Sequence, residues 1–77
     1  MPTIFRKKGY RFFFYINEHL PAHIHIEKDD KTAKFVIKPL ELVRSRKFNA
    51  SEIREVRKLV EENIELFKQK WDEYFSD

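Results

Sequence analysis

Three histidines lie close together in the segment HLPAHIH, residues 19–25, and they are the only histidines in the chain. His23 and His25 are two residues apart, so in a β-strand their imidazole rings would project from the same face, about 7 Å apart. Pro21 restricts the loop before them, and a fold in that loop would bring His19 to the pair. Imidazole binds metal ions and transfers protons near neutral pH, so this segment is the first candidate for chemistry.

One interpretation of the segment is a metal site. Zinc accepts three neutral imidazole nitrogens and leaves a fourth position open, so His19, His23 and His25 would form the ligand set. Glu27 would share the strand face with His25 and supply an oxygen ligand. In this interpretation the protein holds zinc, and the metal is either functional or purely structural.

A second interpretation needs no metal. RNA is cleaved when one imidazole removes the proton of the 2′-hydroxyl and another protonates the leaving oxygen, while a cation stabilises the charged phosphorane. His23 and His25 would be the catalytic pair. The cations would come from neighbouring strands, and the candidates are Arg11, Lys34 and Lys38.

The simplest alternative gives the histidines no chemical role. Ile24 and Ile26 would then pack in the core, and His23 and His25 would be the solvent-facing residues of the same strand. The residues by themselves leave these three alternatives open.

The distribution of charge favours an anionic partner. The net charge is +3, but residues 1–50 contain 11 Lys and Arg against 5 Asp and Glu, whereas residues 51–77 contain 5 against 8. A basic first part and an acidic last part indicate a basic surface, and nucleic acid is the commonest partner of such a surface.

Length and composition limit the class of protein. A chain of 77 residues predicts one domain, residues 1–77, with a small core to which 8 Phe, 3 Tyr and 1 Trp contribute. The absence of cysteine excludes a disulfide framework and a thiolate metal site. The first ten residues lack the apolar stretch of a signal peptide and no segment is apolar enough to span a membrane, so a cytoplasmic protein is expected.

The two parts of the chain have different hydrophobic periods. Residues 1–48 predict a small antiparallel sheet of four or five strands, and residues 49–76 predict one long helix packed on one face, an α+β fold. The expected strands are Thr3–Arg6, Tyr10–Ile16, His23–Lys28, Thr32–Lys38 and, less regular, Leu40–Arg46. Asn49 would cap the helix, with Glu52 completing a capping box. The apolar stripe of the helix consists of Ile53, Val56, Val60, Ile64, Phe67, Trp71 and Tyr74.

Alternation along the strands separates a core face from an open face. The core face would contain Tyr10, Phe12, Phe14, Ile16, Ile24, Ile26, Phe35 and Ile37. The open face would contain Arg11, Phe13, Tyr15, His23, His25, Glu27, Lys34, Val36 and Lys38. Phe13 and Tyr15 would either stack on bases, as sheet platforms do with single-stranded RNA, or be covered by other protein.

The chain also resembles a known family over nearly its whole length. The segments MPTIF, EHLPAHIHIEKDD, AKFVI, SRKFNASEIREV and WDEYF, with Gly9 ahead of an aromatic strand, are similar to short bacterial proteins grouped as domain of unknown function four-one-six-zero. The most specific motif is Pro-x-His-x-His, here Pro21 to His25, with Ala22 where members tend to have a second proline. The resemblance implies a neighbour-encoded partner protein and a toxin–antitoxin-type gene pair. A motif centred on His23 and His25 also favours a role for the two imidazoles.

These observations lead to one functional expectation and two alternatives. We expect a cytoplasmic bacterial protein of a toxin–antitoxin-type module that binds or cleaves RNA through the open face, with His23 and His25 at its centre. The expected nucleic-acid contacts are Arg11, Tyr15, Lys34, Lys38 and Arg44. The alternatives are a non-enzymatic module that pairs with the neighbour-encoded protein, and a small zinc-binding protein. An apolar open face also favours a homodimer.

Overall fold

The computed structural model describes residues 3–14, 22–37 and 39–75. It contains one five-stranded antiparallel sheet and two helices, which confirms the α+β class. The elements are β1 (Thr3–Lys7), β2 (Tyr10–Phe13), β3 (His23–Lys28), β4 (Lys31–Ile37), β5 (Leu40–Arg46), α1 (Ala50–Glu62) and α2 (Ile64–Phe75).

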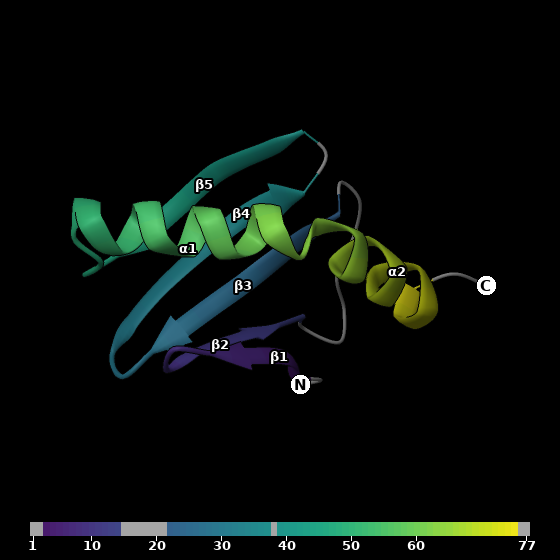
Figure 1. Ribbon diagram of the computed structural model, residues 1–77, viewed down its shortest axis with the longest axis horizontal. Coiled ribbons are helices and arrows are strands. Elements are labelled where there is room, and N and C mark those ends of the chain that lie inside the picture. The colour runs from purple at the N-terminus through teal and green to yellow at the C-terminus, as the bar shows by residue number, and fades with distance from the viewer. Residues whose placement is uncertain (1–2, 15–21, 38, 76–77) are drawn as a thin grey trace.

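The strands follow one another across the sheet in the order β1-β2-β3-β4-β5 (Figure 1). Tight turns make this order possible. Lys8 and Gly9 both have positive φ, 55° and 84°, which matches the backbone of a two-residue hairpin turn between β1 and β2. Asp29, with φ 56°, begins the two-residue turn between β3 and β4. Neighbouring strands are therefore antiparallel, and β1 and β5 form the two edges.

The core lies between one face of the sheet and the helices. The predicted core face is confirmed for every described strand residue, because Tyr10, Phe12, Phe14, Ile24, Ile26, Phe35 and Ile37 are all buried. Ile16 lies outside the described residues. Val56 and Val60 of α1, and Phe67 and Trp71 of α2, supply the other half of the core.

The start of the helical part agrees with the sequence. The Asn49 side chain accepts a hydrogen bond from the Glu52 backbone N–H at 2.8 Å, and the Glu52 carboxylate accepts one from the Asn49 backbone N–H at 3.0 Å. This reciprocal pair is the predicted capping box, and it satisfies two N–H groups that the first turn of a helix leaves without partners.

The prediction of a single long helix is wrong, because the helical part breaks at Asn63. The Asn63 backbone N–H donates to the Val60 carbonyl instead of the Leu59 carbonyl, and the Asn63 side-chain amide donates to Leu59 at 2.8 Å. An Asn side chain that competes for backbone partners in this way tightens and ends a helix. The apolar stripe continues across the break, so the periodicity contains no sign of it.

The break lets α2 turn and cover the end of the sheet (Figure 1). Phe67 stacks on Phe12 of β2 at 5.5 Å between ring centroids, and Trp71 meets the Phe14 ring edge-on at 5.2 Å. Neither helix of the described part of the chain is long and apolar enough to cross a membrane.

Tyr10 connects the sheet to α1 through a polar contact. Its ring is buried, and its hydroxyl donates a hydrogen bond to the Glu55 carboxylate at 2.8 Å. Burial, and then the hydrogen bond and the negative charge of Glu55, raise the pKa of the Tyr10 hydroxyl to about 12 from an ordinary value of 10.0.

The raised pKa of Tyr10 predicts a loss of stability in alkali. The folded state favours the neutral phenol, so this stabilisation is complete below pH 10.0 and is lost as the pH rises through about 12. The difference in free energy of unfolding between the wild type and Tyr10→Phe should therefore shrink over this interval, as measured by urea denaturation. Tyr74→Phe, at a residue 52% exposed, should follow the wild type. Parallel losses in the wild type and Tyr10→Phe would contradict the prediction.

Candidate functional site

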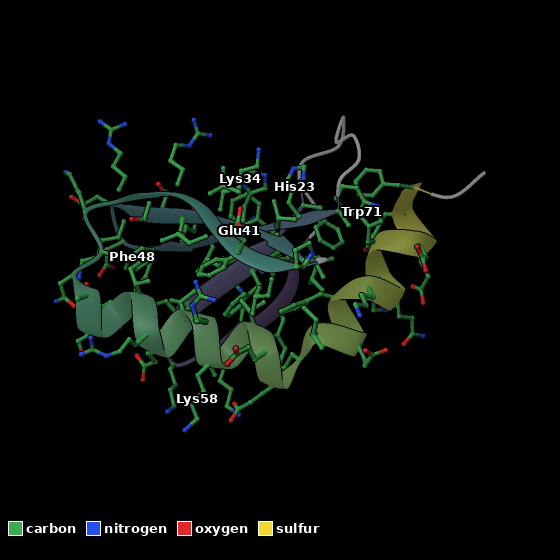
Figure 2. The ribbon with its side chains drawn as sticks, turned by 90° about the horizontal axis from the view of Figure 1, so that it is seen from above. His23, Lys34, Glu41, Phe48, Lys58 and Trp71 are labelled. Carbon is green, nitrogen blue, oxygen red and sulfur yellow. The ribbon has the colours of Figure 1, made fainter. Side chains whose placement is uncertain are left out.

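The open face of the sheet, opposite the helices, carries all of the predicted site residues that the structure describes. These are Arg11, His23, His25, Glu27, Lys34 and Arg44. Tyr15, His19 and Lys38 lie outside the described residues. In Figure 2, His23 and Lys34 lie on the side of the sheet away from α1, whereas Lys58 of α1 lies on the opposite side of the molecule.

Strand pairing arranges the open face in two rows. In the first row, Phe13 pairs with His25, His25 with Lys34, and Lys34 with Arg44, so four strands contribute one side chain each. In the second row, the same strands contribute Arg11, Glu27, Thr32 and Arg46. Neighbouring residues of a row lie about 4.8 Å apart, the separation of the strands. Residues from four separate segments are thus brought side by side.

A bulge in β5 puts its two arginines on this face. Lys34 pairs with Arg44 and Phe35 pairs with Leu42, so Val43 is an extra residue without a counterpart in β4. Strict alternation would put Leu42 and Arg44 on one face, because they are two residues apart. The extra residue shifts the alternation by one, so that Leu42 packs against the core and Arg44 faces the open side.

All residues of the two rows except Arg11 line a hollow of about 280 Å³ on the open face, which we call the cationic hollow. It is lined by Phe13, His25, Ile26, Glu27, Thr32, Ala33, Lys34, Arg44 and Arg46. Within the described part of the chain, Lys34, Arg44 and Arg46 form no ion pair with a carboxylate. Three positive charges therefore meet at one concave surface, and the carboxylate of Glu27 is already held by Arg11.

Arg11 is held by contacts within the protein. Its guanidinium donates to Glu27 at 2.7 Å and to the Thr3 hydroxyl at 2.8 Å, and it lies 4.4 Å from the centre of the Phe13 ring. Only 17% of the Arg11 side chain is exposed. Phe13 is 3% exposed beneath it, so its ring offers no surface on which a base could stack. Phe13 and Glu27 line the hollow, and Arg11, which does not line it, holds both of them in place.

The two histidines have different environments. Their ring centroids are 5.2 Å apart and the rings are nearly perpendicular. His25 is half-buried, stacks on Phe13 at 5.5 Å and lines the cationic hollow. His23 is only 6% exposed, and Trp71 of α2 packs against it at 5.3 Å.

The expectation of an exposed histidine pair is therefore wrong for His23. The alternation of β3 does put His23 on the open face and the buried Ile24 on the core face, as expected. The turn at Asn63, however, carries Trp71 around the end of the sheet, where it packs against both Phe14 and His23 (Figure 2).

A metal site is not assembled among the described residues. They contain no group of three His, Cys, Asp or Glu side chains that could hold a metal ion. Glu27, one of the proposed ligands, pairs with Arg11 at 2.7 Å. The zinc site that includes His19 stays a prediction, because His19 lies outside the described residues.

The sequence did not predict two residues of the site. Arg46 and Thr32 line the cationic hollow, although neither was among the predicted contacts. A signal for Arg46 existed, because it is two residues from Arg44 in the same predicted strand. No comparable signal indicated that Trp71 would cover His23, since that contact joins segments 48 residues apart in number.

Comparison with known proteins gives the family of this chain. The model of the family described as Domain of unknown function (DUF4160) matches residues 9–72 of the 77 residues, and the chain belongs to that family. No curated protein and no solved structure matches the chain.

The different environments of the histidines predict different effects of alanine substitution. His23→Ala should lower the free energy of unfolding by about 2 kcal/mol, because it leaves a cavity beside Trp71. His25→Ala should cost less than about 1 kcal/mol, because this side chain is half-buried. Urea denaturation of the two variants measures both values. An equal or larger loss for His25→Ala would contradict the assignment of His23 to the packed interior.

Proposed function

We propose that this member of the DUF4160 family binds RNA through the cationic hollow. The observation that carries the proposal is the convergence of Lys34, Arg44 and Arg46 on one concave surface, without a carboxylate partner among the described residues. Cations that are neighbours on one sheet face repel one another and weaken the fold. A bound polyanion would remove that repulsion, and phosphate groups pair well with arginine.

The charge of the rest of the molecule is consistent with this proposal. Other cations are partly neutralised within the protein, for example Lys31 by Glu52 at 2.7 Å and Lys47 by Asp30 at 2.8 Å. The Lys31 contact lowers the pKa of the Glu52 carboxyl, and the Lys47 contact lowers that of Asp30. Acidic residues thus pair with cations elsewhere in the molecule, while the cations of the hollow stay available to a ligand.

The geometry favours binding over cleavage by a histidine pair. Proton transfer by two imidazoles requires both rings to reach the substrate, and His23 is covered by Trp71. His25 does line the hollow, where its imidazole would hydrogen-bond to a phosphate, ribose or base. We therefore assign His25 a contact role in the RNA site, and His23 a supporting role behind it.

The cellular setting of the proposal comes from the family resemblance. We propose that the protein acts in the bacterial cytoplasm as one half of a toxin–antitoxin-type pair, with RNA as its ligand and the neighbour-encoded protein as its partner. Formation of a stable complex between the two proteins would support the pairing, and competition of that complex with RNA would place the partner near the cationic hollow.

Neutralising the two arginines of β5 tests the proposal. Arg44→Gln/Arg46→Gln should bind labelled single-stranded RNA about tenfold more weakly or worse at low ionic strength. Each lost phosphate contact should also reduce the slope of log affinity against log salt by about 0.7, so the double variant, which keeps Lys34, should lose about 0.7 to 1.4. Fluorescence anisotropy over a series of salt concentrations measures both quantities.

The matched control removes two charges from the opposite side of the molecule. Arg54→Gln/Lys58→Gln alters two exposed cations that share one surface of α1, and Figure 2 shows Lys58 on the opposite side of the molecule from Lys34. This variant should bind RNA as the wild type does. An equal loss in both variants would mean that only net charge matters, and absence of binding by the wild type would refute the proposal. Shortening of the RNA by the wild type, but not by His25→Ala, would replace binding by cleavage.

A further inference from the structure

We infer that the ligand of the cationic hollow is a short piece of single-stranded RNA that lies along β5, with two consecutive phosphates on Arg44 and Arg46 and the nucleoside between them in the hollow. This inference rests on the proposed function and adds the form, direction and length of the bound segment. The supporting observations are the spacing of Arg44 and Arg46 along β5 and the residues that end the positive track on either side of them.

The spacing of the two arginines suits one strand of nucleic acid. Arg44 and Arg46 are two residues apart on the same face of β5, so they are separated by about 6.8 Å along the strand. This is close to the distance between consecutive phosphates of an extended nucleic-acid strand. Because β5 is an edge of the sheet, a polynucleotide that follows it can enter and leave without crossing other strands.

The third cation reinforces one of these two positions. Lys34 pairs with Arg44 across β4 and β5, about 4.8 Å away, so both side chains can contact the same phosphate. His25 is the next residue of that row, one strand further from the edge. The order from the edge inward is therefore two cations and then an imidazole, which places the phosphate at the rim and the sugar or base over His25.

The positive track along β5 is short at both ends. On one side of Arg44 and Arg46, the next open-face position after the bulge is Glu41, which pairs with Val36 and is exposed. On the other side, the strand ends at Arg46 and the following Lys47 pairs with Asp30 at 2.8 Å. A carboxylate and a neutralised lysine thus limit the track to two phosphates.

The hollow favours a single strand over a duplex. Its volume of about 280 Å³ offers room for one nucleoside, and Thr32 and His25 supply groups that can hydrogen-bond to the base or to the 2′-hydroxyl. In a duplex the base is paired and stacked inside the helix, so it cannot enter the hollow. Only the arginines at the rim would then make contact.

Two measurements with the whole protein test the inference. The first compares a labelled single-stranded octauridylate with a blunt RNA duplex of mixed sequence that presents more phosphates. The single strand should bind at least about tenfold more tightly, the factor expected for one accommodated base. Thr32→Val and His25→Ala should each reduce this preference, because they alter the hollow that only the base of a single strand can enter. The control Arg54→Gln/Lys58→Gln should keep the wild-type preference.

The second measurement counts the phosphates of the RNA that contact the protein. For single strands the slope of log affinity against log salt is about −0.7 for each contact, so two contacts predict a slope near −1.4. Phosphates of the octauridylate can be replaced by neutral methylphosphonates, one at a time or two at a time. Replacement of two adjacent phosphates should weaken binding more than replacement of one phosphate or of two distant ones.

The outcomes separate this inference from the proposed function. Equal or tighter binding of the duplex, or a slope of about −3 or steeper, would overturn the short single-stranded footprint and leave RNA binding through the arginines intact. Failure of the wild type to bind either RNA at low ionic strength would refute both. Tight single-strand binding with a slope near −1.4, weakened about tenfold or more by Arg44→Gln/Arg46→Gln, would support both.

Discussion

The burial of one face of the sheet beneath a single helical layer is the constraint on which the rest of the structure depends. Among the described residues, the helices are α1 and α2, and they cover one side of a five-stranded sheet. Because strand residues alternate between two faces, burying Phe12, Ile24 and Phe35 on one side necessarily presents their neighbours on the other. The basic open face is therefore a direct consequence of how the core is built.

Two local irregularities convert this simple arrangement into a specific site. The bulge at Val43 shifts the alternation within β5, so that the same strand contributes Leu42 to the core and Arg44 to the hollow. The break at Asn63 redirects the helical part, so that Trp71 covers His23 while His25 stays at the hollow. Without the first irregularity the hollow would lack two of its three cations, and without the second the two histidines would have similar environments.

The aromatic side chains join the site to the core in one continuous series of contacts. The Arg11 guanidinium lies over Phe13, Phe13 stacks on His25, and His25 contacts His23. His23 in turn packs on Trp71 of α2. The wall and floor of the hollow are thus held by the same packing that attaches α2, which keeps the ring of His25 in a defined orientation toward a ligand.

The amino-acid sequence by itself determined the strand faces, the helix start at Asn49 and the α+β class, because these depend on short-range periods and on one capping box. It also indicated the open-face positions of His25, Lys34 and Glu27. Only the tertiary structure decided the break at Asn63, the position of Arg46 in the hollow beside the predicted Arg44, and the burial of His23. The break depends on local hydrogen bonds of the Asn63 side chain, the facing of Arg46 on one extra residue in β5, and the burial of His23 on a contact with Trp71, far away in the chain. None of these leaves a mark in the local hydrophobic period.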